Sequence, residues 1–201
     1  MIRIALFASG RGSNLEALFV ALEGRRDAAV ALVASDRSDA AALERARVRG
    51  VETAVVVPDD AVGIRAALDS ARIDWIVLAG YLKRVPVEVV RQYRNRILNI
   101  HPALLPAHGG KGMYGERVHA AVLEAGDATT GASVHLVDEE YDRGPVVARE
   151  TVAVEPGDTP ATLAARVLEV EHRLLPAVVI AAAEGRIRVE GDRAWVEEGN
   201  R

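Results

Sequence analysis

Short apolar runs alternate with helical patterns along the first half of the chain. Apolar runs predict strands over residues 2–8, 29–34, 53–57, 74–79 and 96–100. Apolar residues at helical spacing predict helices from Leu15 to Leu22 and over residues 40–49, 61–71 and 87–93. Near-continuous apolar strands that alternate with helices are typical of a parallel sheet covered on both faces. The predicted fold class is therefore α/β, with a Rossmann-like, mostly parallel central sheet flanked by helices.

The pattern changes in the second half of the chain. It predicts a helix over 118–124, antiparallel strands over 131–137 and 146–154, a helix over 159–183 and a terminal hairpin over 187–189 and 194–196. An acidic loop, 138–145, joins the two antiparallel strands. Pro176 lies inside the last helix and is expected to kink or interrupt it.

Composition narrows the classes of function. The chain has 201 residues, 50% of them hydrophobic, which suffices for one α/β domain with a substantial core. Its net charge is −4 and its charged residues are interspersed, which argues against a nucleic-acid partner. It has no cysteine, which excludes disulfides and thiolate chemistry. With no signal peptide and no apolar run long enough to span a membrane, it is expected in the cytoplasm, without a membrane partner. The sequence leaves its oligomeric state open.

Candidate catalytic residues follow the strand at 96–100. Asn99 and His101 are two positions apart, so an extended chain projects both side chains to the same side. Histidine suits proton transfer near neutral pH, and an asparagine beside it can donate to an oxygen that gains negative charge. A buried, hydrogen-bonded histidine at a strand end is the structural alternative.

A glycine-rich turn follows the first strand. The residues from Ser9 to Asn14 read Ser-Gly-Arg-Gly-Ser-Asn and lead into a helix. Strand, glycine turn and helix form a phosphate-binding arrangement, because the backbone N–H groups at the helix start point at the anion. Ser13 and Asn14 suit the helix cap and can add side-chain donors. An ordinary turn that needs glycine for its geometry is the structural alternative. Both this turn and His101 follow strands, and ligands of parallel sheets bind at the carboxyl ends of the strands.

Five motifs in order give the chain a resemblance to a known family. They are Gly12-Ser13-Asn14-Leu15, Asn99-x-His101-Pro102-x-Leu104-Leu105-Pro106, Ser133-Val134-His135, Asp142-x-Gly144-Pro145 and Glu171-His172. Together they resemble the folate-dependent glycinamide ribonucleotide formyltransferases over about residues 1–185. Two features depart from the family pattern: Ala103 replaces the usual serine, and residues 107–115 replace the usual loop.

The resemblance implies the reaction and its catalytic residues. The enzyme would transfer a formyl group from 10-formyltetrahydrofolate, a co-substrate, to the amine of glycinamide ribonucleotide in purine biosynthesis, with no metal. Asn99 and His101 would stabilise the oxyanion, and Asp142 would partner His101 and move protons. A carboxylate near His101 would favour its imidazolium form. A charge in a solvated acidic loop is the alternative for Asp142.

The resemblance also implies the binding residues. Gly12, Ser13 and Asn14 would hold the substrate phosphate, and Glu171 would contact the substrate unless it pairs with a neighbouring arginine. The folate would lie against the backbone of Val137, Asp138, Glu139, Glu140 and Tyr141 and against Lys83, Arg84 and Val85. Either Lys83 or Arg84 would meet the folate tail, or remain a solvated charge. The chain would form one formyltransferase domain over 1–201: a phosphate-binding half (1–100), a catalytic and folate-binding half (101–185) and the hairpin (186–201).

Other classes of protein share some of these features. A nicotinamide-dependent oxidoreductase fits Gly10-x-Gly12 and Asp36, but Leu15 stands where the fingerprint needs a third glycine. A formyltetrahydrofolate hydrolase is expected to carry an extra N-terminal domain, and a methionyl-tRNA formyltransferase an extra C-terminal one. A non-enzymatic nucleotide- or folate-binding module shares every binding feature. A metal enzyme is disfavoured, because the five histidines are scattered.

Overall fold

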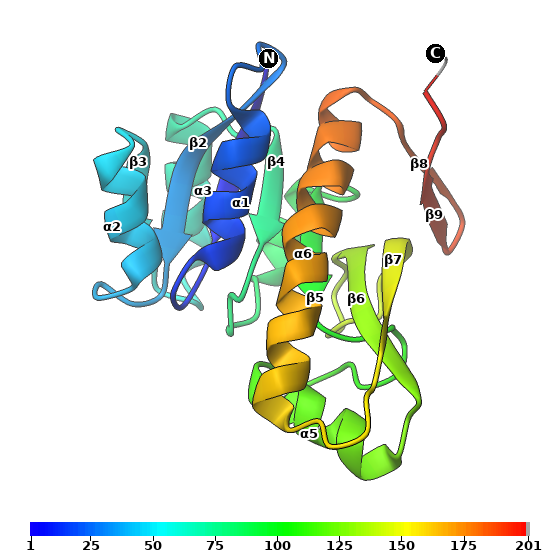
Figure 1. Ribbon diagram of the computed structural model, residues 1–201. Helices are drawn as coiled ribbons and strands as arrows, with labels where there is room; N and C mark the ends of the chain where they lie inside the picture. The colour runs from blue at the N-terminus through cyan, green and yellow to red at the C-terminus, as the bar shows by residue number, and fades with distance from the viewer. Residues whose placement is uncertain (200–201) are drawn as a thin grey trace. The chain divides into compact units, whose positions relative to one another are not determined.

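The computed structural model describes residues 1–199, and the last two residues of the predicted 186–201 segment lie outside the described part. The chain divides into two compact units, with residues 1–99 in the first and residue 100 onward in the second. Figure 1 shows the elements of both units along the chain.

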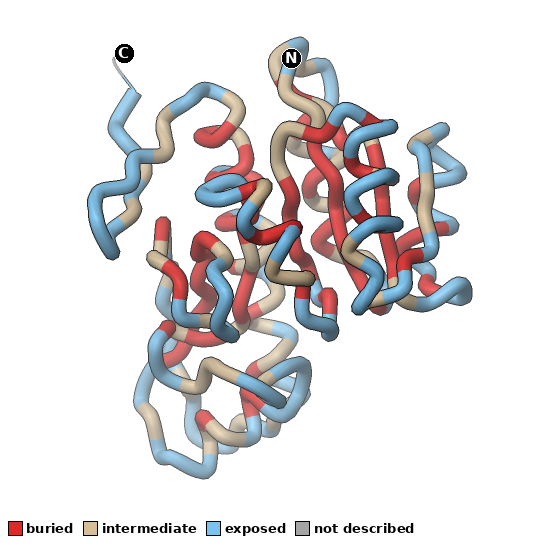
Figure 2. Tube along the Cα trace, turned by 180° about the vertical axis from the view of Figure 1, so that it is seen from behind, coloured by how far each residue is buried: buried red, intermediate tan, exposed pale blue. Residues whose placement is uncertain are grey.

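Five parallel strands form the sheet associated with unit 1. They lie in the order β3-β2-β1-β4-β5, and their bounds are Ile2–Phe7 (β1), Ala28–Ser35 (β2), Glu52–Val55 (β3), Trp75–Leu78 (β4) and Ile97–His101 (β5). The central strands β1, β2 and β4 are mostly apolar and largely buried (Figure 2). Because all five strands are parallel, the chain leaves each of them at the same edge of the sheet.

Four helices connect these strands: α1 (Ser13–Leu22), α2 (Ala41–Val48), α3 (Ala61–Ser70) and α4 (Val87–Gln92). Helix α1 packs beside α2, and α3 packs beside α4. In Figure 1, α1 and α2 lie in front of the strands and α3 lies behind them, so helices cover both faces. Leu15 and Leu18 lie on the apolar face of α1, which packs into the core, and both are fully buried.

Unit 2 contains the antiparallel strands. Its elements are α5 (Glu116–Ala125), β6 (Thr129–Leu136), β7 (Val146–Ala153), α6 (Pro160–Ala183), β8 (Ile187–Glu190) and β9 (Arg193–Val196). Strand β6 pairs antiparallel with β7, and β8 with β9. Helix α6 packs against β6, β7 and α5, while β9 lies against β7. The predicted α/β class, with parallel strands followed by antiparallel ones, is confirmed.

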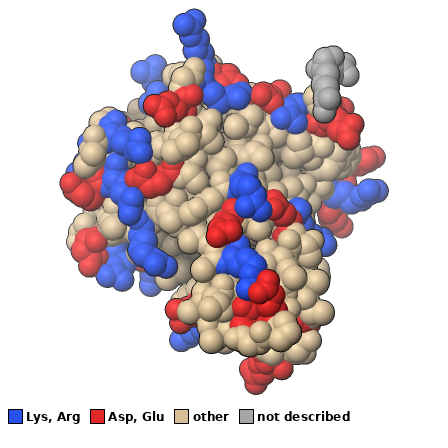
Figure 3. Space-filling model, in the orientation of Figure 1, with Lys and Arg blue, Asp and Glu red and all other residues tan. Residues whose placement is uncertain are grey.

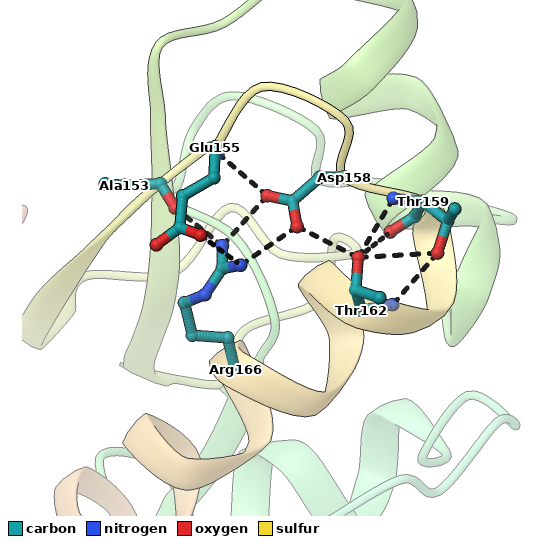
Figure 4. Close-up of polar contacts among 6 residues, drawn as sticks. All are labelled: Ala153, Glu155, Asp158, Thr159, Thr162 and Arg166. Atoms are coloured by element: carbon teal, nitrogen blue, oxygen red, sulfur yellow. Dashed lines mark hydrogen bonds and ion pairs between the residues drawn. The ribbon is translucent and has the colours of Figure 1, made fainter.

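Helix α6 begins at a dense polar cluster (Figure 4). The Thr162 N–H donates to Thr159 Oγ1 at 3.2 Å, and the Thr159 N–H donates to Thr162 Oγ1 at 2.9 Å. This reciprocal capping box satisfies two amide groups that a helix start leaves without partners. Asp158 accepts from both terminal nitrogens of Arg166, at 2.8 and 2.9 Å, and ties the start of the helix to its second turn.

The expected interruption at Pro176 is wrong. Helix α6 runs unbroken through this residue for 24 residues. A proline removes one backbone hydrogen bond, but Leu175, Val178 and Val179 around it are almost fully buried. Their packing outweighs the lost bond. No helix within residues 1–199 has the length and apolarity needed to cross a membrane.

Candidate active site

A buried serine of β6 supports the turn that follows His101. The Ser133 hydroxyl donates to the Ala103 carbonyl at 2.7 Å and accepts from the Leu105 N–H at 3.0 Å. Ser133 is 0% and His101 is 3% exposed. Ser133 thereby fixes the His-Pro-Ala-Leu-Leu segment at two points, the carbonyl of Ala103 and the amide of Leu105. His101 consequently has a defined position.

Both ring nitrogens of His101 face protein groups. Its Nε2–H donates to the backbone carbonyl of His108 at 2.8 Å. Its Nδ1 lies 3.6 Å from Asp142 Oδ2, beyond ordinary hydrogen-bond distance. With the proton on Nε2, the neutral ring presents a lone pair at Nδ1. A second proton at Nδ1 would face the carboxylate directly.

Asp142 is held in place by the loop that follows β6. Its backbone has a positive φ of 54°, and its side chain is 11% exposed. Two residues later, a Cβ on Gly144 would meet the Leu136 carbonyl oxygen at 1.9 Å, so only glycine permits this close approach. The Gly110 N–H donates to Asp142 Oδ2 at 2.9 Å.

A second histidine, His135, lies on the other side of the carboxylate. Its Nε2 is 3.4 Å from Asp142 Oδ1, and its Nδ1–H donates to the Leu136 carbonyl at 2.9 Å. Since Nδ1 already carries a proton, a proton on Nε2 makes the ring an imidazolium. The sequence motif contained His135 without assigning it a role. The available signal was its alternation with Ser133, which places two polar residues on one face of the strand.

The surroundings of His101 and Asp142 favour a neutral imidazole and an ionised carboxylate. Burial lowers the pKa of His101, and the Asp142 charge opposes this shift without reversing it. Burial would raise the pKa of Asp142, but the His135 contact, the His101 charge and the Gly110 amide outweigh it, so this pKa is lowered. The resting pair is therefore a neutral imidazole beside a carboxylate. The expectation that Asp142 favours the imidazolium has the correct sign for that one interaction, but burial dominates.

The glycine turn of unit 1 leads into α1 through a left-handed residue. Gly12 is the N-cap, with φ 74°, and no side chain caps the helix. The expected capping role of Ser13 and Asn14 is wrong, because they are the first two helical residues. The first backbone bond of the helix runs from the Glu16 N–H to the Gly12 carbonyl at 3.2 Å. The amides of Ser13, Asn14 and Leu15 precede it and head the helix, as an anion site requires.

Neighbouring segments of unit 1 fix this turn. The Ala42 N–H donates to the Gly10 carbonyl at 3.2 Å, and Arg45 Nε–H donates to the Arg11 carbonyl at 2.9 Å. Because β1, β4 and β5 are parallel neighbours, the turn after β1, the segment after β4 and Asn99 in β5 lie at one edge of this sheet. The segment after β4 contains the predicted folate residues Lys83, Arg84 and Val85, of which only Val85 is buried.

The remaining predicted residues lie in unit 2. Val137 is half-buried, and the four residues after it, Asp138, Glu139, Glu140 and Tyr141, are exposed on the loop that leads to Asp142. Asp138 accepts from the Glu140 N–H at 2.8 Å, which forms a local turn. Glu171 is half-buried on α6. Within residues 1–199, no three histidine or acidic side chains are grouped in a way that could hold a metal ion.

Comparison with known proteins agrees with this arrangement. A family model described as formyl transferase matches residues 2–179. The chloroplastic phosphoribosylglycinamide formyltransferase of Arabidopsis thaliana is 42% identical over 98% of this chain and 68% of that protein. The phosphoribosylglycinamide formyltransferase of Escherichia coli K12 is 36% identical over 98% of this chain and 94% of that protein. A crystal structure of the Anaplasma phagocytophilum phosphoribosylglycinamide formyltransferase superposes with a TM-score of 0.91 at 30% identity, covering 100% of this chain and 96% of that one.

The chain therefore belongs to the formyl transferase family. Its candidate site contains motifs through which the sequence resembles the glycinamide ribonucleotide formyltransferases. The predicted enzyme class and function, phosphoribosylglycinamide formyl transfer in de novo purine biosynthesis, are confirmed by these similarities.

Proposed function

We propose that 10-formyltetrahydrofolate is the formyl donor and that His101 and Asp142 move the proton that the transfer requires. The observation that carries this proposal is the contact of 3.6 Å between His101 Nδ1 and Asp142 Oδ2. A neutral, buried imidazole beside an ionised carboxylate can accept a proton at Nδ1 and then be stabilised as an imidazolium.

The proposed step moves one proton in each direction. The amine nitrogen of glycinamide ribonucleotide attacks the formyl carbon, and the carbonyl oxygen becomes an oxyanion. The amine gives up a proton to the His101–Asp142 pair, directly or through water. The carbon–nitrogen bond to the folate then breaks as the carbonyl re-forms, and the folate nitrogen takes up one proton. The catalytic pair ends as it began.

Oxyanion stabilisation falls to Asn99 and His101. Asn99 contributes an amide donor from the same face of β5. In the resting arrangement His101 Nε2 is engaged by the His108 carbonyl. Nδ1 is therefore the nitrogen that donates to the oxyanion once it is protonated. A hydrogen bond that forms only as charge develops stabilises the transition state more than the ground state.

Binding roles follow the same reasoning. We assign the substrate phosphate to the turn formed by Gly12, Ser13 and Asn14 at the start of α1, and a further substrate contact to Glu171. The folate lies against the backbone of 137–141 and beside Lys83, Arg84 and Val85, with either cation near its carboxylate tail. The single formyltransferase domain and the cytoplasmic location remain predictions.

The test is a two-substrate assay. Purified protein is mixed with 10-formyltetrahydrofolate, with and without glycinamide ribonucleotide, and deformylation of the folate is followed. Turnover is expected only with both substrates and is expected to be lost in His101→Ala. Equal turnover with water alone would indicate a hydrolase, and reduction of a nicotinamide cofactor would indicate a dehydrogenase. Binding of both substrates without turnover would indicate a binding module.

A further inference from the structure

One loop touches both members of the catalytic pair. The segment 107–115 accepts the His101 Nε2–H at the His108 carbonyl, at 2.8 Å. The same loop donates its Gly110 N–H to Asp142 at 2.9 Å. It also packs tightly, because a Cβ on Gly109 would lie 3.2 Å from the Asp142 Cβ. The orientation of His101 relative to Asp142 therefore depends on the backbone conformation of residues 108–110.

The conformation of His108 needs external support. Its φ is +52°, in the left-handed region that residues other than glycine rarely adopt. Its imidazole Nε2–H donates to Asp127 Oδ2 at 2.6 Å, a short charge-assisted contact. The His108 side chain is 17% exposed and that of Asp127 41%, so the contact is partly shielded from water. A side chain anchored at its tip restricts the backbone that carries it.

The anchor itself is rigid. Asp127 follows the end of α5, where the Gly126 N–H donates to the Leu123 carbonyl at 3.1 Å and the Asp127 N–H donates to the Val122 carbonyl at 3.3 Å. These bonds close the helix end with a left-handed Gly126. The 107–115 loop is thereby attached to a fixed point of unit 2.

We propose that the His108–Asp127 contact is a positioning clamp, which holds the His108 carbonyl against His101 Nε2 and so sets the ring for proton exchange with Asp142. The proposal rests on the proposed function of His101 and Asp142. Neither His108 nor Asp127 need touch a substrate. Both act through the backbone of the loop, and neither belongs to the family motifs.

Four variants and one control distinguish a positioning effect of the His108–Asp127 contact from a general loss of stability. Asp127→Ala removes the anchor without altering residue 108, and Asp127→Asn keeps an acceptor oxygen in the same place. His108→Ala removes the anchor and disfavours the left-handed backbone, whereas His108→Gly removes the anchor but adopts that backbone easily. The matched control is Glu124→Ala, which removes one acidic charge from an exposed position of α5.

Steady-state kinetics give the first readout. For Asp127→Ala and His108→Ala, kcat is expected to fall about tenfold with little change in the KM of either substrate, the scale of one charge-assisted hydrogen bond. Asp127→Asn and His108→Gly are expected to recover most of that loss. Glu124→Ala is expected to retain wild-type kcat. Unchanged kcat in folded Asp127→Ala, or equal losses in His108→Gly and His108→Ala, would overturn the clamp.

Imidazole NMR titration gives a second readout that needs no activity. The groups facing His101 are Asp142, His135, His108 and His119. The His108 carbonyl raises the pKa of His101, so loss of this acceptor is expected to move the His101 titration to lower pH in Asp127→Ala. An unchanged titration contradicts the clamp. If the wild-type enzyme transferred no formyl group, the proposed function would fail, and the titration would still decide the clamp.

Discussion

Two aspartates of unit 2, Asp158 and Asp142, have the same side chain and opposite environments. Asp158 receives two bonds from Arg166, one from the Glu155 N–H and one from the Thr162 hydroxyl, all within 2.9 Å (Figure 4). Asp142 accepts from the Gly110 N–H at 2.9 Å and faces two imidazoles at 3.4 and 3.6 Å. Asp158 is satisfied by groups that do not exchange protons near neutral pH, whereas the neutral imidazole of His101 beside Asp142 can accept one.

The difference shows what makes a carboxylate reactive. The Arg166 guanidinium holds the pKa of Asp158 far below its usual range, which fixes its charge and its geometry. The pKa of Asp142 is also lowered, but burial opposes that shift. For both Asp142 and His101, burial and the neighbouring charge shift the pKa in opposite directions, which is typical of groups that exchange a proton. Paired charges such as Asp158 and Arg166 are common on this protein, and acidic and basic side chains lie side by side on the face in Figure 3.

The largest effect is expected from Asp142→Asn. The amide keeps the shape and an acceptor for Gly110 but cannot share a proton with His101. Turnover is expected to fall about 10²- to 10³-fold. Because the Asp142 charge raises the pKa of His101, its removal is expected to move the His101 limb of the pH–rate profile to lower pH. Single-turnover rates across pH measure both.

The matched control is Asp158→Asn, for which turnover is expected to stay at the wild-type level. Losses in Asp142→Asn and His101→Ala should not add in the double variant, because the two residues serve one proton transfer. Wild-type turnover and pH profile in Asp142→Asn would contradict the proposed relay.

Asp158→Asn is expected to act on stability instead, with a definite pH dependence. A carboxylate whose pKa is lowered in the folded state stabilises it above the unfolded pKa of about 4, and this contribution is lost as pH falls through the folded pKa. The urea midpoint of the wild type should therefore exceed that of Asp158→Asn at pH ~6. The gap should narrow as pH falls below ~4. A gap independent of pH would show that the Asp158 charge contributes nothing.

Gly12→Ala tests whether the phosphate turn tolerates a side chain. The added Cβ would lie 2.9 Å from the Ala42 Cβ, at a φ of +74°. The backbone conformation alone is expected to cost about 1–2 kcal/mol. Gly10→Ala is the matched control, because nothing lies within 4 Å of its Cβ position. Unfolding free energies and affinity for inorganic phosphate should both fall in Gly12→Ala only. Equal behaviour of the two variants would show that the close packing at Gly12 has no effect on either.

The close packing at Gly12 limits which substitutions can report phosphate binding. A bulky Gly12→Val substitution would displace α2 as well as any anion, so it cannot report phosphate binding separately from folding. Ser13→Ala adds no atoms to the turn and keeps its backbone amide. It is the cleaner probe of side-chain donation to the anion.

Much of the fold could be predicted from the sequence because its signals are local. Apolar runs and helical spacing predicted all the strands of unit 1 and the antiparallel pair of unit 2 to within about two residues. Motifs also pointed to His101 and Asp142, and in unit 2 the two side chains lie 3.6 Å apart. An interruption at Pro176 was wrong because tertiary packing, not local propensity, decides whether a buried helix continues.

The rest of the site depends on contacts between distant segments. His108 and Gly110 contribute backbone groups, whose roles leave no mark on residue type. The partner of His108, Asp127, lies 19 residues away. Its position is set by how α5 ends. No periodicity links these residues, so only the folded chain shows that they belong to one site.

The smallest effect is expected from Thr159→Ala at the α6 capping box. It removes the side-chain acceptor of the Thr162 N–H, which typically lowers the free energy of unfolding by about 1 kcal/mol. Thr159→Ser keeps the acceptor and should restore nearly all of this loss. Urea unfolding measures the stability, and formyl transfer by the folded variants is expected to match the wild type. If turnover fell in Thr159→Ala as far as in Asp142→Asn, the polar cluster of α6 would serve catalysis, and the contrast between the two aspartates would not hold.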